Sequence, residues 1–354
     1  GASGDLAPLS HMCLPLMGEG ELMQKAADGL WITRPASEVL KEKGWAPISL
    51  GPKEGLALIN GTQMMSALLA YGLSQLETLW TQAHGIASLS LAAFEGLDAP
   101  FHPAVHALRQ HEGQRSSAAA MRGWLEGAAF LRETHEWVQD PYSFRCIPQV
   151  YGAVRKAIDL GIETLEGEAT AVTDNPILLP ESGEVISAGN FHGEPLAVIL
   201  DHLKVAASEL GTMSERRIFK LLSGTRGLPP FLATDPGLDS GLMIVQYTAA
   251  SIVARNKMRA MPASVDTIDS SNGQEDHVSM GANSGLQLLA VIQGTREILG
   301  CELLTGSQAL HFRSDPGLSD RQAAFLGRFR SMVPPQEGDV EQSSRMRAAG
   351  VFLG

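Results

Sequence analysis

The tripeptide Ala2-Ser3-Gly4 is the stretch of this 354-residue sequence whose residue types permit unusual backbone chemistry. Glycine allows backbone angles and close approaches that a Cβ atom would block, and alanine adds little bulk. The amide nitrogen of Gly4 can then attack the carbonyl carbon of Ala2 with loss of water, which closes an imidazolone ring. Loss of the Ser3 hydroxyl as a second water leaves a methylidene group, an electrophile that can capture an electron-rich substrate group.

The same tripeptide also suits a plain structural role. Asp5 follows it as a candidate helix N-cap, and Pro8 fits the first turn of a helix. The local sequence therefore leaves two interpretations open: a self-formed electrophile, and a turn of small residues before a helix.

Three histidines form a second candidate for chemistry. His102 and His106 stand at the i, i+4 helical spacing that can hold zinc, and His111 follows. The metalloprotease signature also needs a glutamate directly after the first histidine, and Pro103 stands there. We therefore expect no metal, and a solvated helix start at these histidines.

Composition limits the classes of partner. With 44% hydrophobic residues the chain can bury a large core, and its formal net charge of -12 disfavours nucleic acid and anionic membrane as partners. Small molecules and other proteins remain. Cys13, Cys146 and Cys301 lie too far apart in sequence for a metal motif or a disulfide framework, which fits a reducing compartment. We expect a cytoplasmic protein.

Apolar residues that recur at steps of three and four predict long helices. One such stripe follows Thr62, a candidate N-cap, and another follows Pro195, which suits a first helical turn. The first stripe comprises Met65, Leu68, Leu69, Leu73, Leu76, Leu79 and Trp80, and the second comprises Leu196, Ile199, Leu200, Leu203, Ala206, Ala207, Leu210 and Met213. Further helices are expected over residues 243–259 and 285–304. These lengths predict an all-α fold, a bundle of long helices.

Strand signals are confined to one short segment. Residues 177–179 and 184–186 flank a Pro-Glu-Ser-Gly turn, which predicts a minor β-hairpin. Segments rich in Gly, Pro, Ser or Asp predict loops at 44–55, 139–146 and 223–241. The sequence has no internal repeat and no long linker, so we predict a single mainly helical domain over residues 1–354.

Eight sequence blocks, taken in order, resemble the aromatic amino acid ammonia-lyase family, and within it the histidine ammonia-lyases. These blocks are "GASGDLAPLSHM", "GLALINGTQ", "QDPYSFRCIPQVYGA", "AVTDNPI", "GNFHGEP", "SERRI", "GLPPFL" and "NGQEDHVSMGA". The resemblance covers residues 1–312 as the family core and leaves 313–354 as a C-terminal helical tail. It implies the helical architecture of the fumarase/aspartase-like superfamily.

The resemblance assigns catalytic roles to several residues. It implies that Ala2, Ser3 and Gly4 form a methylidene-imidazolone (4-methylidene-imidazol-5-one) autocatalytically, in place of an external cofactor. Asn60 matches the family's asparagine near the electrophile and the substrate amine. Tyr142 matches an active-site tyrosine whose hydroxyl lies near the electrophile.

Further matches concern substrate binding. Arg145 matches the residue that binds the substrate carboxylate, a role suited to the planar fork of guanidinium donors. Gln139 and Phe191 match a polar and an aromatic lining residue. Glu275 matches the glutamate at the side-chain end of the substrate, where a carboxylate suits an imidazole better than a phenyl ring.

Local sequence alone also allows structural roles for these residues. Asn60 lies in an Asn-Gly-Thr segment that makes a good turn and cap. Phe191 can belong to the core, and Tyr142 and Arg145 can be surface or interface groups. We assign no catalytic role to His192 and His277.

The implied reaction is the non-oxidative elimination of ammonia from L-histidine to give trans-urocanate, the first step of histidine degradation. In the family, the base that removes the β-proton is assigned to a tyrosine upstream of the tripeptide. The chain begins with glycine, so we expect a separate or missing N-terminal segment that supplies it. The resemblance further implies a homotetramer whose active sites draw residues from several subunits.

Three departures from the usual histidine-lyase pattern keep alternatives open. Ile147 and Asp239 replace a common glutamine and a common asparagine, and residues 306–313 differ from the usual helix ending. The first alternative is a tyrosine or phenylalanine ammonia-lyase or aminomutase of the same family. The second is a non-catalytic helical scaffold or pseudoenzyme.

Overall fold

The structure is a computed structural model that describes residues 2–132 and 137–354, so Gly1 of the first sequence block lies outside the described residues. It divides into two compact units. Unit 1 comprises Gly1–Ala70, Glu163–Asp201 and Pro262–Leu286, and unit 2 comprises Tyr71–Ile162, His202–Met261 and Gln287–Gly354. That the whole chain folds as one domain stays a prediction.

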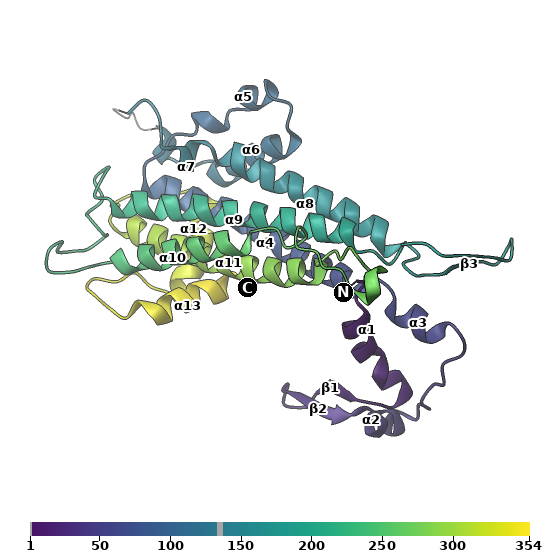
Figure 1. Ribbon diagram of the computed structural model, residues 1–354. Coiled ribbons are helices and arrows are strands. Elements are labelled where there is room, and N and C mark those ends of the chain that lie inside the picture. The colour runs from purple at the N-terminus through teal and green to yellow at the C-terminus, as the bar shows by residue number, and fades with distance from the viewer. Residues whose placement is uncertain (1, 133–136) are drawn as a thin grey trace. The chain divides into compact units, whose positions relative to one another are not determined.

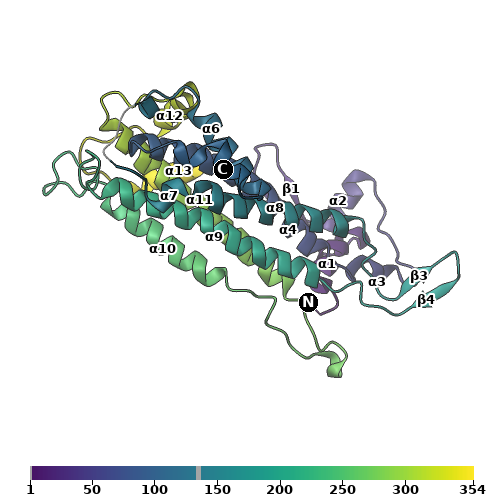
Figure 2. The same ribbon diagram turned by 90° about the horizontal axis from the view of Figure 1, so that it is seen from above.

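Four long helices dominate the chain and contribute residues to both units (Figures 1 and 2). They are α4 (Gln63–Ala93), α8 (Ile147–Ala169), α9 (Glu194–Leu222) and α11 (Gly281–His311). The all-α prediction is confirmed, and three of these helices extend the predicted segments. The predicted helix over residues 243–259 is α10 (Met243–Arg259).

Unit 1 holds the short elements around the N-terminus and two hairpins. They are α1 (Leu6–Cys13), the 3-10 helix η1 (Leu14–Met17), β1 (Glu21–Lys25), β2 (Trp31–Pro35), α2 (Ala36–Lys43), α3 (Glu54–Ile59), β3 (Ile177–Leu179), β4 (Glu184–Ile186) and η4 (Ser271–Gly273). The antiparallel β3–β4 hairpin pairs Ile177 with Ile186, as predicted. Confining strands to that segment was wrong, because β1 and β2 pair around an Asp28-Gly29 turn in which Gly29 has a φ of +85°.

Unit 2 holds the remaining helices. They are η2 (Ala99–Phe101), α5 (Pro103–Ala107), α6 (Glu112–Leu125), η3 (Phe130–Arg132), α7 (Tyr142–Arg145), α10, α12 (Asp320–Met332) and α13 (Gln342–Phe352). The short helix α7 corrects the predicted loop at 139–146. Within unit 2, α10 lies alongside α9 (Figures 1 and 2). Gln246 Nε2 on α10 donates to Glu215 Oε1 on α9 at 2.7 Å.

The predicted apolar stripes form the core. All eight stripe residues of α9 are buried, from Leu196 to Met213. Five of the seven stripe residues of α4 are buried, and Leu68 and Trp80 are half-buried. Periodicity alone therefore identified the inward faces of both helices.

The two predicted caps differ from the structure. Asp5 precedes α1, but its side chain makes no cap hydrogen bond to that helix. Instead, Asp5 Oδ2 accepts the backbone N–H of Met65 in the first turn of α4 at 2.9 Å. Thr62 stands directly before α4, and its hydroxyl donates to Glu168 Oε1. The carboxylate that caps α4 thus comes from a residue far away in sequence.

Of the three histidines expected to be solvated, His102 and His111 are exposed but His106 is buried. His106 is 2% exposed; its Nε2 donates to the Pro100 carbonyl at 2.9 Å and its Nδ1 accepts from Gln114 Nε2 at 2.9 Å. His102 Nδ1 accepts the backbone N–H of Ala104 at the start of α5. Both rings therefore have structural partners.

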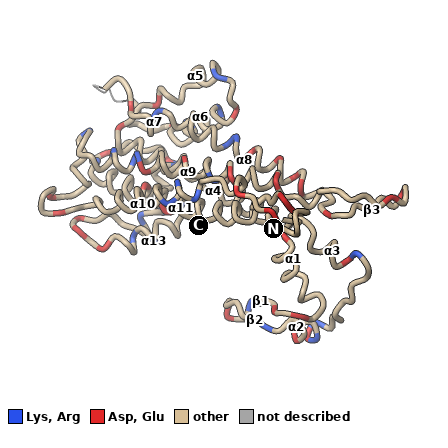
Figure 3. The backbone as a smooth tube through the Cα atoms, viewed as in Figure 1, with Lys and Arg blue, Asp and Glu red and all other residues tan. Residues whose placement is uncertain are grey.

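One apolar segment passes a membrane-span test by length and composition. Within Glu54–Ala93, the most apolar window has a mean hydropathy of 1.2 and is 39% buried. The same segment contains buried polar groups with partners, such as Ser90, which donates to Glu302. These internal hydrogen bonds are typical of a core helix. Figure 3 shows that acidic and basic residues are interspersed along the helices and loops.

His84 on α4 is a buried titratable group in unit 2. Its Nδ1 donates to the Trp80 carbonyl and its Nε2 accepts from the Ser117 hydroxyl, both at 2.7 Å. Burial lowers the pKa of His84 from 6.5 to about 4, and the positive charge of Arg217 adds to the shift. The folded protein therefore holds this imidazole neutral.

We predict that His84 makes unfolding pH-dependent. Below pH 6.5 the imidazole of His84 is protonated in the unfolded chain, whereas in the folded chain it binds a proton only near pH 4. The contribution of neutral His84 to the free energy of unfolding is therefore fully present above pH 6.5 and is lost as the pH falls to 4. The loss amounts to about 3 kcal/mol. Denaturant unfolding from pH 7.5 to 4 measures it. A His84→Gln variant should show a flatter profile, and an unchanged slope would assign the effect to other groups.

Candidate active site

The tripeptide is held tightly in unit 1. Ser3 Oγ donates to Asn60 Oδ1 at 2.7 Å. Gly4 is buried with a φ of +77°, and a Cβ atom there would lie 2.4 Å from the carbonyl oxygen of Gly61. The backbone N–H of Asp5 donates to that same oxygen at 2.7 Å. Only glycine fits at position 4, which is the condition that the proposed ring closure needs.

Three helix N-termini meet next to this loop. Asp5 binds the N–H of Met65 near the start of α4. The Met65 side chain lies against Gly193, which precedes α9, and against Gly281, which begins α11; an added Cβ at either glycine would come within 2.2 Å of it. Each helix N-terminus carries a partial positive charge. Their convergence favours negative charge that develops near the tripeptide.

The electrostatics of Asp5 reflect its burial. Asp5 is 2% exposed, and burial raises the pKa of its carboxyl even though the backbone N–H groups of Met65 and Met64 act in the opposite direction. The carboxylate is thus a desolvated acceptor whose remaining stabilisation comes from helix N–H donors.

Asn60 faces Ser3 on one side and a carboxylate on the other. Its Nδ2 donates to Asp174 Oδ1 at 3.1 Å and to the Asn175 carbonyl at 3.3 Å. Asn60 is 2% exposed, so both ends of its amide have protein partners in a buried setting. The structure therefore joins the predicted residues Ser3 and Asn60 directly.

Phe191 and Glu275 also belong to unit 1, where both are half-buried. Glu275 Oε2 accepts from the Ser270 and Ser271 hydroxyls at 3.2 and 2.6 Å. His192, the neighbour of Phe191, donates from Nε2 to the carbonyl of His277 at 3.1 Å. This bond links the two sequence blocks.

The His192–His277 pair also carries a cluster of possible metal ligands. His192, Glu194 and His277 place donor atoms within 4.8 Å of one another. Both ring nitrogens of His192 already have partners, the His277 carbonyl and the Glu194 N–H. The cluster therefore has a structural explanation, and the expectation of no metal stays a prediction.

Gln139, Tyr142 and Arg145 lie in unit 2 and line one cavity of about 460 Å³, together with Lys220 and Arg226. The Arg145 guanidinium carbon lies 4.6 Å from the centroid of the Tyr142 ring. Among residues 2–132 and 137–354, the buried Nε of Arg145 has no hydrogen-bond partner. An unpaired guanidinium donor beside a cavity suits a carboxylate ligand.

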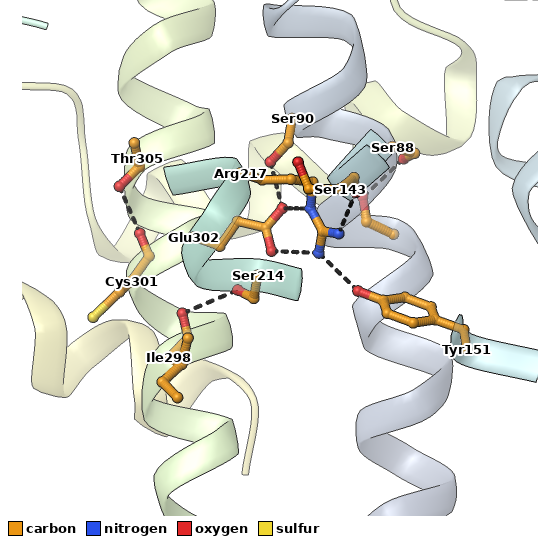
Figure 4. Close-up of polar contacts among 11 residues, drawn as sticks. Ser88, Ser90, Ser143, Tyr151, Ser214, Arg217, Ile298, Cys301, Glu302 and Thr305 are labelled. Carbon is orange, nitrogen blue, oxygen red and sulfur yellow. Dashed lines mark hydrogen bonds and ion pairs between the residues drawn. The ribbon is translucent and has the colours of Figure 1, made fainter. Parts of the chain in front are cut away.

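A buried ion pair supports the helix that carries Tyr142 and Arg145 (Figure 4). Arg217 Nε and Nη2 donate to the two carboxylate oxygens of Glu302 at 2.5 and 2.7 Å. Arg217 also donates from Nη2 to the Tyr151 hydroxyl at 2.7 Å and from Nη1 to the Ser143 carbonyl at 3.0 Å. The Ser143 bond fixes the backbone of α7 between the two predicted site residues.

Sequence reasoning missed the supporting residues of both units. Asp5 was expected to cap its own helix. Arg217 lies in the SERRI block of the family resemblance, but that block assigned it no role. Asp174 stands in a Thr-Asp-Asn-Pro segment, a turn signal that the sequence did offer.

Comparison with known proteins identifies the family. A family model described as "Aromatic amino acid lyase" matches residues 1–331. The chain belongs to the aromatic amino acid lyase family. The resemblance drawn from the eight sequence blocks is thus confirmed, and members of this family use a self-formed prosthetic group rather than an external cofactor.

Three relatives show how close the likeness is. The chain is 46% identical over 341 residues to a histidine ammonia-lyase of Symbiobacterium thermophilum, covering 96% of this chain and 66% of that protein. The crystal structure of histidine ammonia-lyase from Trypanosoma cruzi matches with 37% identity and a TM-score of 0.90, over 100% of this chain and 67% of that one. A tyrosine aminomutase from Streptomyces globisporus matches with 34% identity and a TM-score of 0.93, over 100% and 70%. The chain spans about two thirds of the length of these aromatic amino acid lyase relatives.

We predict that Gly4→Ala destabilises unit 1 more than Gly44→Ala does. Both glycines have left-handed φ angles, +77° and +70°, but only the Cβ at position 4 meets the backbone of Gly61; none of the atoms described lies within 4 Å of the Cβ at position 44. Gly44→Ala should cost about 1 kcal/mol and Gly4→Ala at least about twice that. Denaturant unfolding measures both, and equal losses would contradict the tight packing at Gly4.

Proposed function

We propose that this protein eliminates ammonia from L-histidine to give trans-urocanate, the first step of histidine degradation. The observation that carries the proposal is the Ala2–Gly4 tripeptide. It is held beside the first turn of α4 by the Asp5 carboxylate, and its Ser3 hydroxyl donates to Asn60. The likeness to histidine ammonia-lyases of two organisms supports the substrate.

The tripeptide fits the self-formed prosthetic group of the family. Gly4 nitrogen bonds to the Ala2 carbonyl carbon, and the Ala2 oxygen leaves as water with the amide protons of Ser3 and Gly4. The Ser3 hydroxyl leaves with its Cα proton as a second water. The absence of space for a Cβ at Gly4 supports this assignment. Once formed, the methylidene-imidazolone supplies an electrophile that bonds to the substrate, most simply at its amine.

The remaining site residues bind and orient the substrate. Asn60 Oδ1, which accepts from Ser3, is placed to accept from a substrate amine. Arg145 binds the substrate carboxylate, with Tyr142 and Gln139 beside it in the same cavity. As the family resemblance implies, we propose that these three residues and the tripeptide contribute to active sites shared between the subunits of a cytoplasmic homotetramer. The base that removes the β-proton is then a tyrosine of the family's segment upstream of the tripeptide.

Glu275 selects the substrate in this proposal. Its carboxylate is half-buried and accepts hydrogen bonds from two serine hydroxyls, which hold it on its loop. A carboxylate can accept the N–H of an imidazole and favours its protonated form, whereas a phenyl ring offers it no donor.

A second candidate is a tyrosine or phenylalanine ammonia-lyase or aminomutase. The fold likeness to a tyrosine aminomutase favours it. The replacement of the common glutamine by Ile147 does not favour this candidate, because Ile147 is fully buried at the start of α8 and fills the core there. The third candidate, a non-catalytic scaffold, requires the tripeptide to stay unmodified.

We predict that the complete gene product forms a conjugated acid from L-histidine only. Near-ultraviolet absorbance is followed with L-histidine, L-tyrosine and L-phenylalanine separately. The Glu275→Gln variant is the matched comparison, and it should lose activity on histidine by about tenfold or more because the charge at the imidazole end is removed. Activity on tyrosine or phenylalanine alone would reject the histidine assignment and keep the electrophile.

Peptide mass spectrometry over residues 1–5 tests the electrophile itself. The processed tripeptide should lack two waters, and Ser3→Ala, which has no hydroxyl to lose, should lose activity while its melting temperature is unchanged. An unmodified Ala-Ser-Gly in the active-site peptide would favour the scaffold.

A further inference from the structure

Lys53 lies behind Asn60 on the side away from Ser3. Its Nζ forms an ion pair with Asp174 Oδ2 at 2.8 Å and donates to the Asn175 carbonyl at 3.0 Å. The Lys53 and Asp174 side chains are 24% and 16% exposed, so the pair is largely shielded from water. This shielding makes the ion pair stronger than one on an open surface.

The ion pair continues into the tripeptide through an unbroken series of hydrogen bonds. Lys53 binds Asp174 Oδ2, Asp174 Oδ1 accepts from Asn60 Nδ2 at 3.1 Å, and Asn60 Oδ1 accepts from Ser3 Oγ at 2.7 Å. The backbone N–H of Asn175 also donates to Asp174 Oδ1 at 2.7 Å. Burial alone would raise the pKa of Asp174, but these donors together lower it, so the carboxylate stays ionised.

The carboxylate decides which way the Asn60 amide points. In the observed orientation, the amide NH₂ faces Asp174 and the Asn175 carbonyl, and the amide oxygen faces Ser3. A flipped amide would aim its oxygen at a carboxylate and a carbonyl and would leave Ser3 without its acceptor. The Ser3 hydroxyl therefore has one defined position. Loss of that hydroxyl requires its C–O bond to be aligned with the breaking Cα–H bond, so a fixed side chain favours the step.

The backbone of Lys53 gives a second, independent observation. Its φ is +74°, in the left-handed region that glycine occupies at least cost. Gly44 occupies the same region at +70°. Position 53 thus carries a lysine where the backbone favours glycine, which indicates that the side chain is required.

We propose that Lys53 and Asp174 are positioning residues for the self-processing of the tripeptide: the pair holds the Asn60 amide so that the Ser3 hydroxyl is fixed as the second water is lost. This inference rests on the proposed function, because it concerns how the proposed electrophile forms. The two residues act through Asn60 and do not contact substrate.

The test follows tripeptide processing in the complete gene product. Expression is pulsed and stopped, and the fraction of the residue 1–5 peptide that lacks two waters is measured against time. The variants are Lys53→Gly, Lys53→Arg and Asp174→Asn. Lys25→Met, which removes a lysine from exposed β1, is the matched control. Melting temperature is measured on each protein.

Lys53→Gly separates positioning from stability, because it removes the ammonium group and also relieves the left-handed backbone. Processing should slow at least about tenfold, the effect of one lost charge-assisted hydrogen bond, while the melting temperature is unchanged. Lys53→Arg should recover part of the rate. Asp174→Asn should slow processing similarly, and combining it with Lys53→Gly should add little further loss.

Each other outcome rejects a defined claim. Processing of Lys53→Gly at the unsubstituted rate would overturn the positioning role and leave the proposed function intact. A parallel fall of processing and melting temperature in all variants would make the pair merely structural and overturn it too. An unprocessed tripeptide in the unsubstituted protein would overturn the proposed function and this inference together.

Discussion

The hydrogen bond from the Met65 N–H to the Asp5 carboxylate is the contact on which the geometry of the candidate site depends. It joins the residue that follows the tripeptide to the first turn of α4, and Gly193 and Gly281 pack against the same methionine. An N-cap of this kind contributes about 1 kcal/mol in ordinary settings. Its larger effect here is geometric. It holds the tripeptide next to Met65, and the starts of α9 and α11 pack against the same methionine.

The buried pair of Arg217 and Glu302 has a comparable role in unit 2, for a different physical reason. Both side chains are fully buried, and desolvation offsets most of the attraction between them, so net stability is a poor explanation for the pair. However, each hydrogen bond that the Arg217 guanidinium donates has a fixed direction, including the one to the Ser143 carbonyl. The exposed pair of Arg255 and Glu297, at 3.4 Å with side chains 50% and 40% exposed, contributes little by comparison. The buried network specifies where α7 lies rather than how strongly it is held.

Features set by local sequence could be predicted, and features set by distant contacts could not. The α9 stripe and the β3–β4 hairpin follow from periodicity and turn residues within one segment, and the structure places them as expected. The β1–β2 hairpin is short and exposed, so its hydrophobic alternation gives little signal beyond the Asp28-Gly29 turn. The bond between Asn60 and Asp174 joins residues 114 apart in sequence, and only the folded chain brings them together. Family resemblance could name Asn60, but it offered no reason for the direction in which its amide points.

The proposed electrophile and the proposed substrate selector are supported by different kinds of structure. The tripeptide is fixed by helix ends, a buried carboxylate and a glycine that cannot be replaced, which leaves few permitted substitutions. Glu275 lies after the 3-10 turn η4, where Ser271, Asn272 and Gly273 all have positive φ and where the carboxylate bonds only to serines of its own turn among the residues described. Such a loop can change its side chains without disturbing the helix ends. Because the proposed selector lies on a separate loop, the substrate can change while the surroundings of the electrophile stay the same. This explains how one family can include both lyases and aminomutases of closely similar fold.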